Sequence, residues 1–199
     1  MAGAAELDLG VVVAFVVVIG FLVGSIPFGV IVGRKLGVDI RAKGSGNIGA
    51  TNVARVLGIA PGLLVLVLDV AKGAAAAALA IKLCGAPAAV AAAGFAAILG
   101  HCFSPLLGGK GGKGVATALG VFLVISPALA LVAVAVFLVI AGRTRVPALG
   151  SLSGVASATI YAFATHAPPP VELLALATTL LLVYTHRGNL ARLYGATSS

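Results

Sequence analysis

The sequence predicts an all-α integral membrane protein with about seven transmembrane helices, some of them short or distorted. Three observations support this fold class. Of the 199 residues, 61% are apolar and 9% are charged, whereas roughly one quarter of an average soluble domain is charged. Long apolar segments follow one another with few interruptions. The 13 basic residues, against 5 acidic ones, gather in alternate connections between these segments.

Seven apolar segments can be delimited, and we interpret each as a transmembrane helix: residues 9–32, 57–83, 86–100, 114–125, 127–141, 148–165 and 171–184. Several are shorter than the roughly 20 residues that a full crossing needs, which indicates distorted helices around a cavity. We expect two helices rather than one across Ser126-Pro127, because proline ends or kinks a helix. With no linker visible, residues 1–199 are expected to form a single transmembrane domain.

The distribution of charge predicts the orientation. If the N-terminus is outside, the cytoplasmic parts are residues 33–56, 101–113 and 142–147 and the tail from His186. These parts hold every basic residue except Lys72 and Lys82, as the positive-inside rule requires. We therefore expect an outer N-terminus, a cytoplasmic C-terminus and polar chemistry on the cytoplasmic face.

The composition also indicates which binding partners to expect. A basic excess on so apolar a chain is typical of loops that face an anionic leaflet, and no aromatic-rich basic patch indicates nucleic acid. Cys84 and Cys102 fall at opposite membrane faces in this topology, so we expect them to stay unpaired. The five acidic residues are scattered along the chain, which predicts no metal site.

The long polar run at residues 44–52, GSGNIGATN, is the first candidate for chemistry. Its glycines expose backbone N–H groups and allow another molecule to approach closely. Arg41 and Lys43 precede it, and Arg55 follows where a helix is expected to begin. A glycine-rich turn before a helix N-terminus, with cations beside it, is typical of phosphate binding. A flexible loop between two spans is the alternative.

The second candidate is the run GGKGGKG at residues 108–114. It resembles a nucleotide P-loop only superficially, because Lys113 is followed by Gly114 rather than Ser or Thr, and we exclude ATP binding. Two lysines remain on a backbone that can wrap an anion before a helix N-terminus, where the macrodipole favours negative charge. Lysines that only set the topology are the alternative.

The third candidate follows the last apolar segment. His186 and Asn189 are three residues apart and share one face of a continuing helix, whereas Arg187 and Arg192 are expected to lie away from that face. A simple basic stop after a membrane helix explains the arginines but not His186 with Asn189.

Asp69 and Lys72 are also three residues apart, within an apolar span where each charge costs roughly 3 kcal/mol. We expect them to pair or to face a polar cavity, with either a structural or a substrate role. His101, at the cytoplasmic end of the third span, could donate or accept a proton, and a structural role is the alternative.

The motifs resemble those of the bacterial acyl-phosphate-dependent glycerol-3-phosphate acyltransferases, integral membrane enzymes that make lysophosphatidic acid. The resemblance covers residues 24–195. It rests on GSGNIGATNVAR at residues 44–55, KGGKGVAT at 110–117 and HRGNLARL at 186–193, with DVAKG at 69–73. Three motifs in order on one predicted membrane face make the resemblance specific.

This resemblance implies acyl transfer from acyl phosphate to the 1-hydroxyl of glycerol-3-phosphate, giving lysophosphatidic acid and inorganic phosphate in phospholipid biosynthesis. It implies no cofactor, a multi-pass place in the bacterial inner (plasma) membrane and an active site toward the cytoplasm. The implied partners are glycerol-3-phosphate, acyl phosphate, membrane lipid and a soluble enzyme that produces acyl phosphate. A substrate phosphate, rather than a protein base, would accept the hydroxyl proton.

The resemblance also implies the site. The catalytic residues would be Ser45, Lys113, His186 and Asn189. The substrate-binding residues would be Gly44, Gly46, Asn47, Thr51, Asn52, Arg55, Gly111, Gly112, Thr117 and Ser151. Lys113 and the glycine-loop N–H groups would hold acyl phosphate, and Arg55, His186 and Asn189 would hold glycerol-3-phosphate.

Some positions depart from the family pattern. Ser104 stands before Pro105, Ala148 replaces a usual serine, and the tail after Leu193 lacks the family's final Glu. The competing hypothesis for function is a membrane transporter of a phosphorylated metabolite, which would also gather cations at one face. Against it, the predicted outer face carries almost no charge to receive an anion.

Overall fold

The computed structural model describes residues 8–193 and 195, and the regular elements of this part of the chain are all helices. The departure from the family pattern in the tail falls mostly outside the described residues. Two short 3-10 helices lie in the connections, η1 (Ile40–Ala42) and η2 (Pro105–Leu107). The α-helices are α1 (Leu9–Gly24), α2 (Phe28–Lys35), α3 (Ala50–Leu57), α4 (Ile59–Leu83), α5 (Pro87–Cys102), α6 (Val115–Ile125), α7 (Pro127–Thr144), α8 (Pro147–Ala164) and α9 (Pro169–Leu193).

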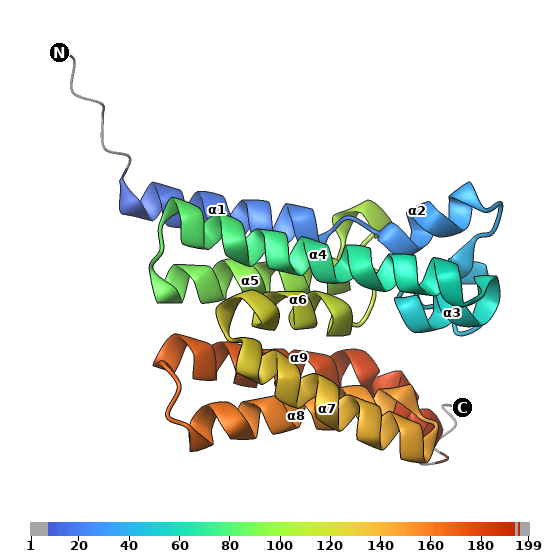
Figure 1. Ribbon diagram of the computed structural model, residues 1–199. Coiled ribbons are helices and arrows are strands. Elements are labelled where there is room, and N and C mark those ends of the chain that lie inside the picture. The colour runs from blue at the N-terminus through green and yellow to red at the C-terminus, as the bar shows by residue number, and fades with distance from the viewer. Residues whose placement is uncertain (1–7, 194, 196–199) are drawn as a thin grey trace.

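The long helices lie side by side along one direction, as Figure 1 shows. One group contains α1, α4, α5 and α6, and the other contains α7, α8 and α9. Helices α2 and α3 lie at one end of the bundle, together with the α5–α6 and α7–α8 connections and the last turns of α9. We call this the loop end. The first described residue, Asp8, lies at the opposite end.

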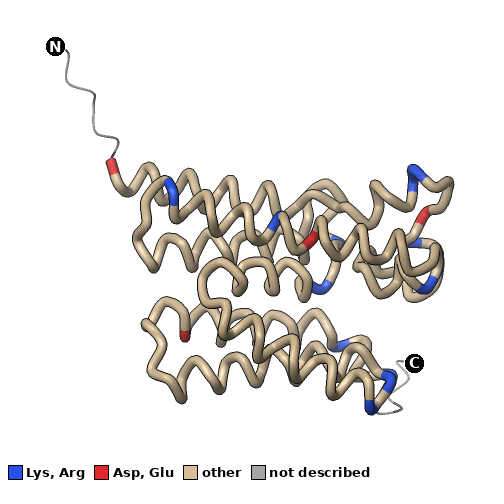
Figure 2. Tube along the Cα trace, viewed as in Figure 1, with Lys and Arg blue, Asp and Glu red and all other residues tan. Residues whose placement is uncertain are grey.

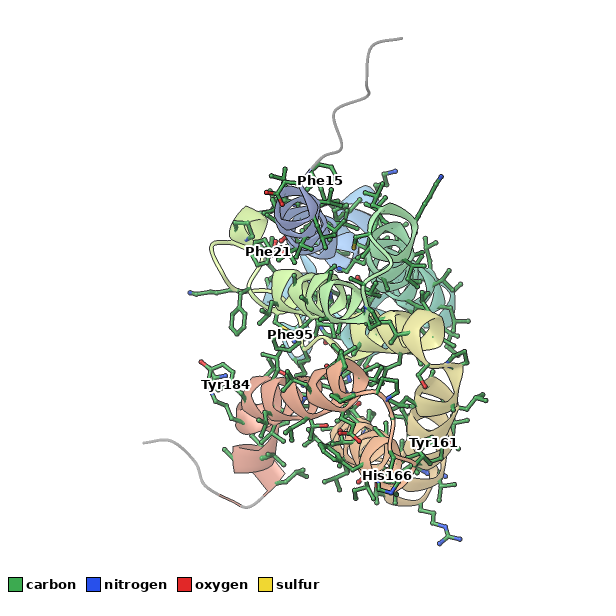
Figure 3. All side chains as sticks on the ribbon, turned by 90° about the vertical axis from the view of Figure 1, so that its left-hand side faces the viewer. Phe15, Phe21, Phe95, Tyr161, His166 and Tyr184 are labelled. Atoms are coloured by element: carbon green, nitrogen blue, oxygen red, sulfur yellow. The ribbon has the colours of Figure 1, made fainter. Side chains whose placement is uncertain are left out.

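Within the described residues, four helical stretches are long and apolar enough to cross a membrane: Leu9–Lys35, Ile59–Leu83, Pro87–Leu107 and Pro127–Thr144. The outside of the bundle is also apolar, since Phe15, Ile160 and Leu173 each expose more than half of their surface. Figure 3 looks along the helices and shows side chains such as Phe15 projecting outward. These are the properties of an integral membrane protein, and a count of about seven crossings stays a prediction.

The first apolar segment, expected as one helix, is broken at residues 25–27 into α1 and α2. Pro27 lacks an N–H group and disfavours a helical conformation of the residue before it. Ser104 Oγ donates to Ser25 O at 2.6 Å, and Lys72 Nζ donates to Ile26 O at 2.8 Å. The polar groups at the break therefore have partners inside the bundle, as an apolar surrounding requires.

The predicted separation at Ser126-Pro127 is confirmed, because α6 ends at Ile125 and α7 begins at Pro127. Another expectation was wrong: the helix after the first glycine-rich run begins at Ala50, well before Arg55. Gly49, with an extended backbone, precedes the first turn. Asn52 thus lies inside α3 rather than ahead of it.

Glycines allow two helix pairs to approach backbone to backbone. A Cβ atom on Gly24 of α1 would overlap Ala97 O of α5, and one on Gly100 of α5 would overlap Phe21 O. Helices α4 and α6 show the same reciprocal arrangement. Such close packing by small residues is typical of membrane helices, where hydrophobic burial does not drive association.

Replacing Gly120 of α6 with valine is expected to destabilise the protein by about 2 kcal/mol or more, because overpacking forces helices apart. Its Cβ would overlap Val70 O of α4, a backbone atom that has no freedom to rotate away. The thermal unfolding midpoint in detergent measures the effect. Gly142→Val is the matched control, because a Cβ there meets nothing within 4 Å; equal midpoints for the two variants would contradict the prediction.

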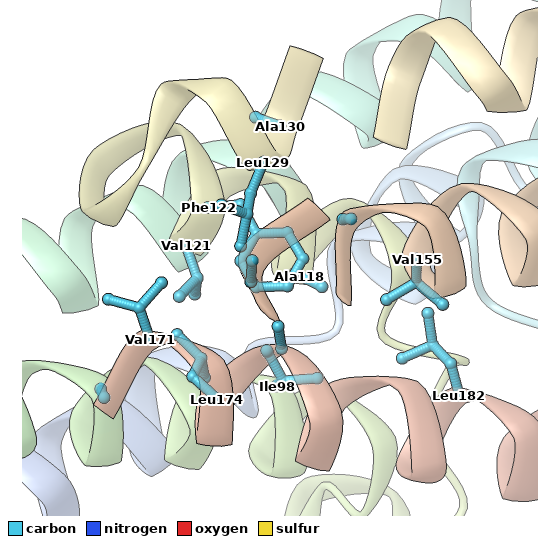
Figure 4. Packing of buried hydrophobic residues seen from close by; sticks show 14 of the residues in the cluster. Ile98, Ala118, Val121, Phe122, Leu129, Ala130, Val155, Val171, Leu174 and Leu182 are labelled. Carbon is cyan, nitrogen blue, oxygen red and sulfur yellow. The ribbon is translucent and has the colours of Figure 1, made fainter. Parts of the chain in front are cut away.

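The largest cluster of buried apolar side chains lies where α5, α6, α8 and α9 meet the start of α7 (Figure 4). Phe122 is its largest member and is 2% exposed. Ile98, Val155 and Leu182 pack in the same cluster. Phe122, Val155 and Leu182 also border the cavity described below, so the core that joins the two helix groups forms part of its wall.

Lys and Arg residues gather at the loop end (Figure 2). Lys82, in the last turn of α4, lies toward the other end. The bundle thus has one strongly basic end, on which all three sequence motifs begin or finish.

Candidate functional site

Asn52 organises the first glycine-rich loop. Its side chain is buried in α3, and its Oδ1 accepts a hydrogen bond from the Ser45 N–H group at 2.8 Å. Its Nδ2 donates to the carbonyl oxygens of Asn47, Lys43 and Ile40 at 2.8, 3.1 and 3.3 Å. Asn52 therefore fixes the backbone of the loop, although it also borders the cavity.

The glycines of this loop serve its turns. Gly44 and Gly46 have left-handed backbones, with φ of 59° and 71°, a conformation that glycine adopts without steric cost. A Cβ on Gly44 would also overlap Asn52 Oδ1. The result is a compact turn that leaves the Ser45 side chain exposed.

The lysine loop, residues 110–114, is fastened to the end of α5. The Gly111 N–H group donates to Cys102 O at 3.0 Å, and the Gly112 N–H group donates to His101 O at 2.9 Å. Cys102 is buried and both cysteines of the chain are free. The backbone leading to Lys113 is therefore positioned by α5.

Lys113 is held by α9. Its Nζ donates to Asn189 Oδ1 at 2.6 Å, and its carbonyl oxygen accepts from Thr185 Oγ1 at 3.1 Å. His186 is buried on the same helix, with Nδ1 2.8 Å from Leu182 O. A neutral ring that donates from Nδ1 leaves Nε2 as an acceptor. The predicted sharing of a helix by His186 and Asn189 is confirmed.

Lys113 has a lowered pKa. Partial burial is the main cause, and the positive charges of Arg192 and Arg55 add to it, so that the pKa falls to about 8. A cation in such surroundings is short of negative partners and favours the arrival of an anion.

Two connected hollows open at the loop end. The main cavity has a volume of about 740 Å³ and extends from the loops into the bundle between α4, α6, α7 and α8. A polar hollow of about 430 Å³ lies beside it. The residues shared by both walls are Ser45, Asn47, Lys113, Asn189 and Arg192. One end of the main cavity is therefore polar and basic, and the other is apolar.

Three helices begin at the wall of the main cavity. Ala50, Val115 and Pro147, the first residues of α3, α6 and α8, all border it. Helix N-termini carry partial positive charge and unpaired N–H groups, which attract phosphate and other anions. Their convergence on one cavity adds to the charge of the side chains.

Four cationic side chains border the main cavity: Arg55, Lys113, Arg145 and Arg192. Arg41 and Lys110 border the polar hollow, and Arg41 is paired with Asp39 at 3.2 Å. The expectation that Arg192 lies away from the face of Asn189 was wrong, because both residues border both hollows, as their spacing of three residues on one helix allows. Arg187 does lie apart, over the ring of Tyr184.

Most of the predicted site residues come together. Those that border the two hollows are Ser45, Gly46, Asn47, Thr51, Asn52, Arg55, Gly111, Lys113, Ser151, His186 and Asn189. Gly44, Gly112 and Thr117 border neither. Thr117 is fully buried where α6 crosses α4, against Gly73. Ser151 Oγ donates to Pro147 O at 2.9 Å, and Ala148 lines the cavity beside it.

Sequence reasoning did not assign Arg145 or Arg192 to the site, and it left the roles of Asp69 and His101 open. Asp69 and His101 both border the main cavity. The signal for Arg192 was its spacing from Asn189. Arg145 follows the last residue of α7 and has a left-handed backbone, φ 59°. No sequence pattern predicted that it would face the cavity.

Comparison with known proteins shows a family match and a match to solved structures. A profile of the glycerol-3-phosphate acyltransferase family matches residues 14–196. The chain is similar to crystal structures of PlsY, an integral membrane glycerol 3-phosphate acyltransferase. Its glycerol 3-phosphate form has a TM-score of 0.87 and 40% identity, and its lysophosphatidic acid form has a TM-score of 0.86 and 39% identity. Both matches cover 94% of each chain.

Curated relatives carry the same name, glycerol-3-phosphate acyltransferase. The relative from Anaeromyxobacter dehalogenans is 58% identical over 119 residues, which cover 57% of this chain and 59% of the relative. The relative from Aquifex aeolicus is 48% identical over 116 residues, 58% and 60% of the two chains. The chain thus spans about three fifths of the length of the curated relatives it matches.

The fold and the cavity define an integral membrane protein with a basic site that opens into an apolar groove. The chain belongs to the glycerol-3-phosphate acyltransferase family.

Proposed function

We propose that the protein transfers an acyl group from acyl phosphate to the 1-hydroxyl of glycerol-3-phosphate, giving lysophosphatidic acid and inorganic phosphate in phospholipid biosynthesis. One observation carries the proposal: a single cavity joins a cationic end, suited to phosphate, to an apolar groove, suited to an acyl chain. The two similar crystal structures, in glycerol 3-phosphate and lysophosphatidic acid forms, support the same substrate and product.

The cationic end offers places for two phosphates on either side of Lys113. Lys113 and the start of α6 would bind acyl phosphate, whereas the Gly111 and Gly112 N–H groups already donate to the end of α5. Arg55, His186 and Asn189 would bind glycerol-3-phosphate, with Arg192 shared by both hollows. Ser45, on the turn held by Asn52, would donate to a phosphate oxygen.

The apolar end of the cavity would hold the acyl chain. Leu63 of α4, Leu138 of α7 and Phe122 of α6 line it. Leu63 and Leu138 are 54% and 62% exposed. Exposed leucines on the cavity wall support entry of the chain sideways from the bilayer.

The chemistry is a substitution at the acyl carbon. The 1-hydroxyl oxygen attacks the carbonyl carbon, an ester bond forms, and the bond from that carbon to the phosphate oxygen breaks. Inorganic phosphate leaves with the electron pair, and a substrate phosphate accepts the hydroxyl proton. Because acyl phosphate is already activated, the protein's contribution is positioning and stabilisation of developing charge by Lys113 and the helix N-termini.

We propose seven membrane crossings, by α1 with α2 and by α4, α5, α6, α7, α8 and α9, with an outer N-terminus and a cytoplasmic C-terminus. The basic loop end supports this orientation in a bacterial inner membrane. The active site would then face the cytoplasm, where a soluble enzyme that produces acyl phosphate would deliver the donor. Residues 1–199 would act as a single domain.

Phosphate release by the detergent-purified protein tests the proposal. With acyl phosphate as donor, release should require glycerol-3-phosphate and should match the lysophosphatidic acid formed. If folded protein binds glycerol-3-phosphate but forms no product, the proposed acyltransferase function is wrong. Uptake of glycerol-3-phosphate into proteoliposomes without product would instead establish the transporter.

The kcat/KM for acyl phosphate is expected to fall by roughly tenfold per pH unit above about pH 8, because Lys113 loses its proton there. Below pH 8 the ammonium is charged and binds the phosphate dianion. This dianion forms near pH 6, so the titration of phosphate does not contribute to the fall in kcat/KM above pH 8. Rate measurements between pH 6.5 and 9.5 check this. The residual activity of Lys113→Arg should show no fall in kcat/KM above pH 8, because arginine stays charged. An unchanged fall in that variant would exclude Lys113 as its cause.

A further inference from the structure

Three ionisable side chains form a buried chain beside the cavity, and the proposed chemistry uses none of them. Asp69 and Lys72 of α4 and His101 of α5 are 1%, 4% and 4% exposed. Lys72 Nζ forms an ion pair with Asp69 Oδ1 at 2.7 Å, and His101 Nδ1 lies 3.6 Å from the same oxygen. Buried charges cost stability unless they are well paired, so their presence calls for a role.

At one end of this chain, Lys72 anchors the carboxylate. Its Nζ also donates to Ile26 O in the break between α1 and α2, and it lies 5.6 Å from the centre of the Phe28 ring. Lys72 thus connects α4 to two residues of the first span. Asp69 is held in place by a lysine that is itself fixed.

At the other end, His101 supports the lysine loop. A Cβ atom on Gly112 would overlap His101 Nε2 and come within 3.0 Å of two ring carbons. The imidazole ring therefore lies directly against the Gly112 backbone, while the His101 carbonyl accepts the Gly112 N–H group. Lys113 is the next residue.

We propose that Asp69 and His101 are positioning residues for Lys113. Asp69 orients the His101 ring, and the ring fixes the position of the Gly112 backbone. That backbone in turn places the Lys113 ammonium at the cavity. This inference rests on the proposed role of the lysine loop in binding acyl phosphate. Loss of the pair should therefore affect acyl phosphate more than glycerol-3-phosphate.

A double-mutant cycle tests the contact between the ring and the loop. Gly112→Ala should raise the KM for acyl phosphate by roughly tenfold or more, because its methyl group collides with the ring. His101→Ala should raise it several-fold by removing the support. In the double variant, Gly112→Ala should add little to the effect of His101→Ala, because the colliding atoms are gone.

Gly111→Ala is the matched control. Its Cβ would overlap the His101 carbonyl oxygen and approach the Cys102 backbone, atoms that His101→Ala leaves in place. His101→Ala should therefore not relieve Gly111→Ala. The KM for glycerol-3-phosphate should stay within about twofold in the His101 variant, since uncoupled sites affect one another little.

Asp69→Asn gives a second measurement that keeps the shape of the pair while weakening its hold on the ring. It should reproduce the rise in KM for acyl phosphate seen in His101→Ala. Multiplicative effects of Gly112→Ala and His101→Ala, or a loss of kcat with both KM values unchanged, would overturn the inference. If wild-type protein lacks phosphate release that depends on glycerol-3-phosphate, the proposed function fails instead.

Discussion

Lys113→Ala is expected to lower kcat/KM for acyl transfer by roughly 10²- to 10³-fold, the range seen when one preorganised charge-stabilising donor is removed. Lys113 is half-buried, its Nζ is held at 2.6 Å by Asn189 Oδ1, and it borders both hollows. Charge develops on the leaving phosphate as the acyl bond breaks, and a fixed ammonium stabilises it without rearranging. Product formation under subsaturating acyl phosphate measures the loss.

Lys82→Ala provides the control for this experiment. Lys82 is an exposed lysine in the last turn of α4, away from the loop end, and its removal changes the net charge equally. We expect its kcat/KM to stay within about twofold of wild type, as for surface substitutions away from a site. Comparable losses in both variants would show that general electrostatic attraction, rather than Lys113 in its place, supports the reaction.

The helices were predictable because membrane segments are long runs of one composition. Periodicity was not needed to find α4 or α7. Pro127 marked the end of α6 and the start of α7. The break at Pro27 was missed because the apolar residues continue on both sides of it. What makes that break stable lies far along the chain: Lys72 and Ser104, which sequence alone does not bring to residues 25 and 26.

The site was predictable where one motif supplies several neighbouring residues. Asn47, Lys113 and His186 come together as their motifs suggested. Arg145 was missed because its place depends on how α7 ends against α8, a contact between helices rather than a pattern in the sequence. The buried chain of Asp69 and His101 depends in the same way on how α4 lies against α5.

Asp69→Ala is expected to destabilise the protein by about 3 kcal/mol, because it leaves a buried ammonium without its carboxylate. Lys72 would retain only Ile26 O and the face of Phe28 as partners. For a chain of this size the unfolding midpoint should fall by roughly 10 °C, as estimated from soluble domains. Thermal unfolding in detergent measures the shift.

The double variant Asp69→Leu/Lys72→Met separates the cost of an unpaired charge from the role of the carboxylate. Apolar residues of similar size replace a buried ion pair with little loss of stability, so the midpoint should return most of the way. The KM for acyl phosphate should nevertheless stay raised, because nothing then orients the His101 ring. A midpoint as low as that of Asp69→Ala would mean that the Lys72 bond to Ile26 O, rather than charge pairing, holds this region together. Restored stability together with a wild-type KM for acyl phosphate would show that the ion pair does not help to position Lys113.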